Sequence, residues 1–343
     1  MKNTLYIFLF ILSMLHISCS NDIAVNPVIK TSEGIFLLSE GSYSAGSSKL
    51  SYYDYSNDSF YVNVVNPYNL GAYPDGMIKY NNNLYLTEQG NFGSAGKIYK
   101  ADINATILSQ QSIGVNPYSL CLANNKIYIT NGPSSKVLII DPVSLNVIKE
   151  ISVGAYPQEI ISYNNKVFVC NTSAYGGVSD STVSIIDAGN DILVNTLKVD
   201  RDPSSLAVTN GSMLIVSSWS AAGKIYVFET INYTLVDTLF SPFGFSKDFS
   251  VDRNSNDVFF IGYDGDIIRL NMDTKQFSKI ITKPEVNSFI YGYVFDYMNG
   301  KHFLADAKNF ISSGSMYVYG ANGVLLKQFE TGITPRRFLI NIN

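Results

Sequence analysis

Short segments of alternating apolar and polar residues recur in pairs along this chain, and each pair is joined by a turn rich in Asn or Gly. Alternation over a few residues predicts β-strands, and Asn tolerates the positive φ of a tight hairpin turn. The pairs begin about every 40–46 residues, which is the period of a four-stranded propeller blade. They cover residues 77–87, 120–130, 160–170, 206–216, 249–261 and 294–304.

The strand count predicts how the ring closes. Complete sets of four strands, named A to D from the centre outwards, begin near Pro74, Pro117, Pro157, Pro203, Phe245 and Phe289. Residues 35–40, 50–54 and 60–65 supply strands B, C and D without a strand A, and residues 335–342 supply a strand A with nothing after it. We therefore predict an all-β, seven-bladed β-propeller over residues 34–343. Its blades are four-stranded and antiparallel, and the ring closes by pairing the N-terminal strands with the C-terminal strand.

The N-terminus has the pattern of an export signal. Lys2 precedes an apolar run over residues 5–15, which is too short to span a bilayer but fits the core of a signal peptide. Together with Cys19, this segment resembles a bacterial lipoprotein signal, although His16 departs from the usual pattern. The resemblance implies a signal peptide over residues 1–18, lipidation of Cys19 and a tether over residues 19–33. It also implies a lipid anchor in the outer membrane with exposure at the cell surface. An ordinary cleaved signal, with a periplasmic or secreted protein, is the alternative.

The propeller part resembles the YVTN-repeat family of exported bacterial seven-bladed propellers. The name-giving strand is closest in residues 127–131 and 167–171, and a Gly-x-x-Pro entry to strand A occurs at residues 71–74, 114–117 and 154–157. These motifs are specific for the fold and weak for activity, because propellers host unrelated functions. Within the wider resemblance, some surface lipoproteins capture corrinoids such as vitamin B12, and others capture ferric siderophores.

Composition and motifs exclude several classes of function. The chain is 46% hydrophobic and 15% charged, which is typical of a folded protein, and it has no Lys/Arg cluster for nucleic acid. Removal of the signal would leave His302 as the one histidine, so no multi-histidine metal site is predicted. Cys121 and Cys170 lie in different blades and are expected as buried thiols, with a disulfide left open. No catalytic motif is present, so we predict no catalytic residues, no cofactor and no enzyme activity.

One face of the ring gathers the candidate ligand-binding residues. In five of the seven blades, the loop between strands B and C holds a single aromatic residue among small, polar neighbours. The connections between strand D and the next strand A lie on the same face and add further aromatics and a few charges. Each ring could instead fold down onto a neighbouring blade. The predicted ligand-binding residues are Tyr43, Tyr73, Phe92, Tyr118, Tyr156, Tyr175, Trp219, Phe245, Lys247, Tyr263, Tyr291, Phe310 and Arg336.

The resemblance and the aromatic face together predict a non-enzymatic cell-surface lipoprotein. It would bind a small or medium-sized ligand and pass it to an outer-membrane transporter of the TonB-dependent type. The near-absence of basic clusters favours cobalamin or another corrinoid over a strongly anionic ferric siderophore. Alternatives are a structural or adhesive protein that binds a protein or glycan, and a propeller lyase or lactonase. The enzyme alternative requires a close polar pair among Asp75, Glu88, Lys247 and Arg336.

Overall fold

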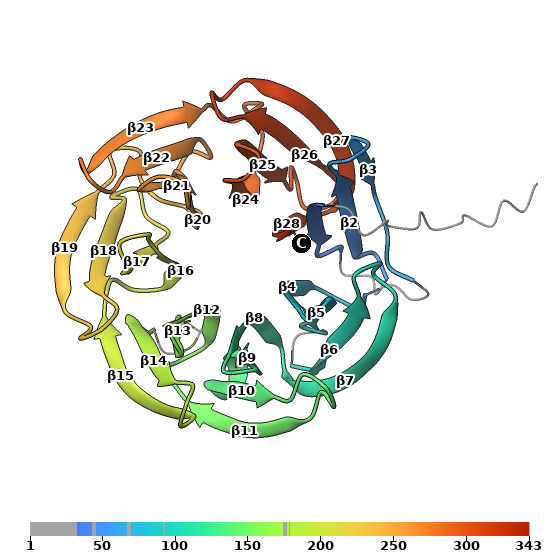
Figure 1. Cartoon of the computed structure of the whole chain (residues 1–343), viewed down its shortest axis with the longest axis vertical. Coiled ribbons are helices and arrows are strands. Elements are labelled where there is room, and N and C mark those ends of the chain that lie inside the picture. Colours follow the sequence, from blue (N-terminus) through green and yellow to red (C-terminus); the bar gives the residue numbers. More distant parts are fainter. Residues whose placement is uncertain are drawn as a thin grey trace, which may run out of the picture.

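The computed structural model describes residues 33–42, 46–66, 70–91, 93–173, 177 and 179–342. Its strands form seven four-stranded antiparallel sheets arranged as blades around a central channel (Figure 1). This confirms the predicted all-β, seven-bladed propeller. Among the described residues, no helix is long and apolar enough to cross a membrane. The predicted signal peptide, Cys19 and the tether up to residue 32 lie outside the described residues.

The blades are numbered in chain order, and the strands of each are given from the centre outwards. Blade 1 contains β28 (Pro335–Asn341), β1 (Gly34–Ser39), β2 (Lys49–Asp54) and β3 (Ser59–Tyr61). Blade 2 contains β4 (Pro74–Tyr80), β5 (Asn83–Glu88), β6 (Ala95–Asp102) and β7 (Ile107–Val115). Blade 3 contains β8 (Pro117–Ala123), β9 (Lys126–Asn131), β10 (Lys136–Ile140) and β11 (Val147–Ser152), with a 3-10 turn at Gly132–Ser134. Blade 4 contains β12 (Pro157–Tyr163), β13 (Lys166–Asn171), β14 (Thr182–Asp187) and β15 (Ile192–Lys198). Blade 5 contains β16 (Pro203–Val208), β17 (Met213–Ser218), β18 (Lys224–Glu229) and β19 (Leu235–Phe240). Blade 6 contains β20 (Lys247–Val251), β21 (Asp257–Ile261), β22 (Ile267–Asn271) and β23 (Gln276–Ile281). Blade 7 contains β24 (Ile290–Asp296), β25 (Lys301–Asp306), β26 (Ser313–Gly320) and β27 (Leu325–Ile333).

The ring closes in blade 1 as the sequence predicts. Strand β28 pairs antiparallel with β1, so that Phe338 lies opposite Leu37 and Ile340 lies opposite Ile35. The outer strand β3 is shorter than the predicted strand over residues 60–65. Beyond it the chain turns inward, where the Val64 amide donates to the Leu50 carbonyl at 2.8 Å and the Val64 side chain is buried.

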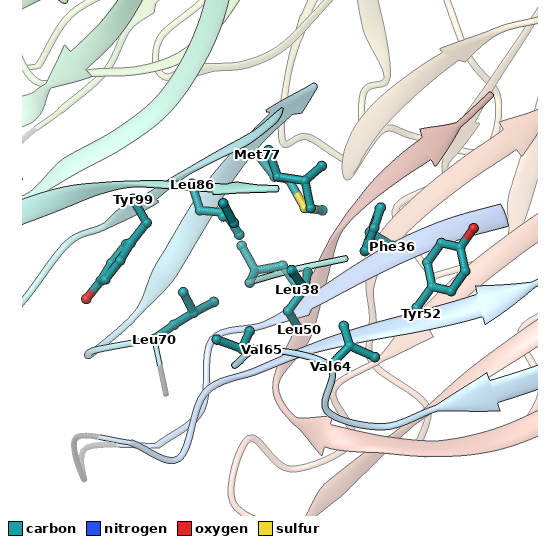
Figure 2. Close-up of a cluster of buried hydrophobic side chains, with 13 residues drawn as sticks. Phe36, Leu38, Leu50, Tyr52, Val64, Val65, Leu70, Met77, Leu86 and Tyr99 are labelled. Carbon is teal, nitrogen blue, oxygen red and sulfur yellow. The ribbon is translucent and has the colours of Figure 1, made fainter. Parts of the chain in front are cut away.

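The hydrophobic core lies between neighbouring blades. Figure 2 shows one such cluster, in which Phe36 and Leu38 of blade 1 face Met77 and Leu86 of blade 2. The same arrangement joins other pairs of neighbours, including blades 4 and 5 and blades 5 and 6. Each apolar side chain buried in this way contributes about 1.5–3 kcal/mol, so each blade depends on its neighbours for stability.

The start of every innermost strand is irregular, and this irregularity positions the candidate site. The register with the next strand shifts at the first residues of all seven strands. In five connections the residue just before the proline of the innermost strand has positive φ, and these residues are Tyr73, Asn116, Tyr156, Asp202 and Thr334. A β-bulge turns consecutive side chains away from strict alternation. As a result, Arg336 and Arg337 both reach Glu159 at the mouth of the channel.

Gly292 allows the close approach of β24 to the closing strand β28. A Cβ atom at this position would lie 1.8 Å from the backbone carbonyl oxygen of Arg336. We expect Gly292→Ala to lower the free energy of unfolding by about 2 kcal/mol, because a backbone carbonyl cannot move aside without disturbing the strand pairing. Urea unfolding measures the change. Gly211→Ala is the matched control, since its Cβ would meet nothing closer than 3.9 Å. Equal unfolding midpoints for the two variants would contradict this reading.

Candidate functional site

Four exposed aromatic rings and the half-buried ring of Tyr291 lie on the loop face, in two groups over blades 5 to 7. Trp219 is 63% exposed and packs against the exposed ring of Tyr263, with ring centroids 5.1 Å apart and an angle of 30° between the planes. In blade 7, Phe310 lies 5.0 Å from Phe289 and 5.3 Å from Tyr291. We call these five residues the aromatic arc. Large rings that remain exposed together are unusual on a surface without a ligand or partner.

Lys247 places one positive charge within this arc. Its Nζ lies 4.0 Å from the centroid of the Tyr291 ring. None of the ion pairs found among the described residues includes Lys247, although the carboxylate of Asp248 is its chain neighbour. Burial and the nearby Arg336 lower the pKa of Lys247 to about 8. The ammonium is therefore mostly charged at neutral pH.

An ion cluster lies at the mouth of the channel, where the innermost strands begin. We define it as Arg336, Arg337, Asp75, Glu159 and Asp248. Arg336 contacts Asp248 at 2.9 Å and Glu159 at 3.1 Å, and its Nε lies 3.8 Å from Asp75. Arg337 contacts Glu159 at 2.8 Å and Asp75 at 3.3 Å. Burial opposes the charge on Arg336, but the carboxylates of Asp248 and Asp75 outweigh it and raise its pKa well above the usual value.

This cluster corrects the predicted role of Arg336. Its side chain is only 2% exposed, and its guanidinium is directed to three carboxylates instead of to the loop face. A channel cavity of about 240 Å³ is lined by four cluster members together with mainly apolar residues of the innermost strands; the four are Arg336, Arg337, Glu159 and Asp248. The cluster therefore ties the closing strand β28 to β4, β12 and β20 across the ring.

Glu40 lies at the end of β1, between the ion cluster and a second cavity. Burial and the neighbouring Asp75 raise its pKa to about 7, with Arg336, Lys247 and the hydroxyl of Tyr291 acting in the opposite direction. The second cavity has a volume of about 540 Å³ and lies on the loop face over blades 7, 1 and 2. We call it the blade 1–2 pocket; its lining residues are Glu40, Gly41, Ser42, Tyr73, Gln89, Gly90, Asn91, Asn116, Phe310 and Thr334.

The remaining predicted residues divide between the face and the core. Tyr73 lines the blade 1–2 pocket, while Tyr118 and Tyr156 are half-buried. Phe245 is a correction: it is fully buried and packs 4.7 Å from Phe249, so it belongs to the core between blades 5 and 6. Three of the predicted residues, Tyr43, Phe92 and Tyr175, lie outside the described residues.

Sequence analysis named Asp75 among the polar residues of this face but missed the other three acidic residues, Asp248, Glu159 and Glu40. Asp75, Asp248 and Glu159 stand at the start of innermost strands, and Glu40 follows an apolar strand B. The sequence shows that these acidic residues lie beside the ends of predicted strands. Which of them contact one another depends on how the blades face each other across the channel. Phe289 is an aromatic residue at the predicted start of a strand A, but it is not among the predicted ligand-binding residues.

The polar pair required by the enzyme alternative is present but is not an exposed acid and base. Asp75 and Arg336 form an ion pair, and both side chains are buried. Glu88 instead accepts hydrogen bonds from the Tyr99 hydroxyl at 2.6 Å and from the Ala72 amide at 2.9 Å.

Within the described part of the chain, no group of three or more His, Cys, Asp or Glu residues could hold a metal ion. Cys121 and Cys170 are buried free thiols, so the alternative of a disulfide between them is wrong.

Comparison with solved structures finds other proteins of this fold. A quinoprotein alcohol dehydrogenase-like protein of Bacteroides thetaiotaomicron is 17% identical, with a TM-score of 0.72 over 91% of this chain and 79% of that one. Hydrazine synthase of Kuenenia stuttgartiensis is 12% identical, with a TM-score of 0.59 over 74% of this chain and 84% of that one. The computationally designed Ika8 protein is also 12% identical, with a TM-score of 0.59 over 88% and 85%. An enzyme and a designed protein match equally well, so these similarities show the fold alone.

Comparison with curated proteins found no match. The resemblance to YVTN-repeat proteins is tested by none of these findings and stays a prediction. The family model described as "Domain of unknown function (DUF5074)" matches residues 33–318. Because this match covers most of the propeller, the chain belongs to the DUF5074 family.

Proposed function

We propose that this protein is a non-enzymatic ligand-binding propeller that takes a medium-sized organic ligand on the aromatic arc. The observation that carries the proposal is the pair of exposed ring groups, Trp219 with Tyr263 and Phe289 with Phe310, on the face where Lys247 contacts the Tyr291 ring. Flat apolar area combined with a single cation suits a ligand that has a broad ring system and polar edges. A corrinoid such as cobalamin has this chemistry and is our first choice of ligand, and a ferric siderophore is the alternative.

The position of the N-terminal strand supports a tethered protein. Strand β1 is the second strand of its blade and runs toward the loop face, ending at Ser39 beside the blade 1–2 pocket. Its first residue, Gly34, is therefore on the opposite face of the disc. A lipid on Cys19 would hold the propeller from that side and leave the aromatic arc free. On this basis we propose a cell-surface lipoprotein that hands its ligand to an outer-membrane transporter.

Titration with cyanocobalamin tests the proposal at the arc. Trp219 is the one tryptophan of the chain, so its fluorescence reports on this position alone. We expect heat in calorimetry and quenching of Trp219 fluorescence at or below tens of micromolar ligand, after correction with free tryptophan for absorption of light by the corrinoid. Trp219→Ala is expected to weaken binding about thirty-fold, since buried aromatic anchors contribute about 2 kcal/mol or more.

The matched control is Ile231→Ala, which removes an 88% exposed apolar side chain from the turn between the two outer strands of blade 5, on the opposite face. We expect it to leave affinity unchanged. Binding that Trp219→Ala leaves intact would remove the arc from the proposal. A third outcome is that cobalamin gives no heat, while a ferric catecholate siderophore binds and Trp219→Ala weakens that binding. This result would keep the aromatic arc as the site and overturn the choice of a corrinoid.

A further inference from the structure

The blade 1–2 pocket is a second cavity with chemistry that differs from that of the aromatic arc. Its volume of about 540 Å³ lies within the range of small-molecule sites. Two rings, Tyr73 and Phe310, contribute its aromatic surface. Its remaining lining consists of one carboxyl group, side-chain amides and hydroxyls, and two glycines. Among the described residues that line it, there is neither Lys nor Arg.

The backbone of the pocket is already held in place. The Glu40 amide donates to the Thr334 carbonyl at 2.9 Å, and the Gly90 amide donates to the Ala72 carbonyl at 3.0 Å. The side chain of Asn116 links two positions of one loop, since its Nδ2 donates to the Gln89 carbonyl at 3.1 Å and its Oδ1 accepts from the Gly93 amide at 2.9 Å. A pocket held by such contacts needs little reorganisation when a ligand binds.

Two side-chain amides and one carboxyl group line this frame. The side-chain amides of Gln89 and Asn91 make no hydrogen bond with any described residue, although both line the pocket. Glu40 contributes a carboxyl group, which has lost much of its water to burial. It accepts from the Tyr291 hydroxyl and keeps further acceptor positions for a ligand. Amides and a carboxylate on one side, with aromatic rings on another, form a surface that has both hydrogen-bonding groups and apolar faces.

We propose that the blade 1–2 pocket binds a neutral saccharide, with Tyr73 and Phe310 against the C–H face of a sugar ring and Glu40, Gln89 and Asn91 bonding its hydroxyls. A sugar ring is apolar on its faces and carries hydroxyl donors around its edge, which matches this arrangement. An anionic ligand lacks a cation among the lining residues. The proposal does not rest on corrinoid binding at the arc, because the two sites share only Phe310.

The test is saturation-transfer NMR and calorimetry on the purified protein with maltose, cellobiose, lactose and diacetylchitobiose at 10 mM, with 3′-sialyllactose as the anionic comparison. We expect at least one neutral disaccharide to bind, and the sialylated sugar to bind no better than lactose. Glu40→Gln is expected to weaken binding about ten-fold, since a bond to a charged acceptor is lost, and Asn91→Ala about three-fold. Trp219→Ala should leave sugar binding unchanged, which separates this site from the arc.

The pH dependence gives a readout that a structural role would not produce. Glu40 faces Asp75 on β4, Lys247 on β20, Tyr291 on β24 and Arg336 on β28, and its pKa is about 7. Ionised Glu40 is the better acceptor, so binding should weaken several-fold between pH 7.5 and pH 5.5 in the natural protein but not in Glu40→Gln. The proposal is overturned if no neutral disaccharide receives saturation at 10 mM, or if binding is the same in Glu40→Gln and Asn91→Ala as in the natural protein.

Discussion

Arg336→Met is expected to lower the free energy of unfolding by about 3–5 kcal/mol. The substitution leaves the Asp248 carboxylate with a single hydrogen bond, from the Tyr293 amide, where it also has two from Arg336. Glu159 and Asp75 would keep Arg337 as a partner, but the cluster would hold three carboxylates and one guanidinium. Unpaired buried charge of this kind is costly, because the protein interior screens it poorly.

The measurement is urea unfolding, with Arg201→Met as the matched control. Arg201 is 67% exposed and pairs with Asp202 at 3.2 Å, so its loss is expected to cost less than 1 kcal/mol. Adding Asp248→Asn to Arg336→Met should restore part of the stability, because it removes the charge that lost its partner. A cost for Arg336→Met no larger than that for Arg201→Met would show that the ion cluster does not hold the ring together.

His302 is expected to make the protein less stable in acid by about 3 kcal/mol between pH 7 and pH 4. Its side chain is buried against Phe259 and Phe295, with ring centroids 5.0 and 4.6 Å away. The hydroxyl of Tyr293 lies 2.7 Å from Nδ1, and the Ala321 backbone interacts with the ring and opposes the effect of burial on its pKa. Burial lowers the pKa of His302 to about 4 from the usual 6.5.

The unfolding free energy falls in acid because the unfolded chain takes up a proton at His302 at a higher pH than the folded protein does. As the pH falls through 6.5 the unfolded chain binds a proton at His302, whereas the folded protein does so only near pH 4. Stability contributed by the neutral histidine is therefore present above pH 6.5 and is lost progressively down to about pH 4. Glu40 acts in the opposite direction, since its raised pKa of about 7 makes the folded protein bind the proton first.

The difference in unfolding free energy between the natural protein and His302→Gln isolates the histidine. Glu40 and the other groups titrate alike in the natural protein and in His302→Gln, so their effects on the difference cancel. The packing cost of the substitution does not change with pH. We expect this difference to change by about 3 kcal/mol between pH 7 and pH 4, measured by urea unfolding at each pH. A difference that stays constant over this range would show that His302 is already charged, or solvated, in the folded protein.

Local sequence determined most of the fold. Alternation and Asn turns are properties of neighbouring residues, and they predicted the strands and the period of the blades. Four of the six predicted blade starts, Pro74, Pro117, Pro157 and Pro203, are the first residues of innermost strands. The pairing of β28 with β1 also followed from counting strands. The N-terminal blade lacks a strand A, and the last strand A of the chain has no blade of its own, so the two were expected to pair.

The candidate site was predictable only in part. Trp219, Tyr263, Tyr291 and Phe310 were predicted from their loops. In the structure Trp219 packs with Tyr263, and Tyr291 packs with Phe310 and contacts Lys247. Phe245 has the same kind of loop sequence but is buried, because the D–A connection before it turns its ring toward Phe249 and Phe260. Whether a loop aromatic stays exposed depends on the neighbouring blade, which lies about 40 residues away in sequence.

By itself, the sequence determined that the chain is a closed seven-bladed ring, because strand pairing within a blade and the repeat period are local properties. Only the tertiary structure decided which charges meet at the channel mouth. The sequence alone does not pair Arg336 with Asp248 or Glu159, because they lie 88 and 177 residues away from it in the chain. Their contact is a consequence of ring closure, which brings the starts of all innermost strands to one axis, where burial forces opposite charges to pair.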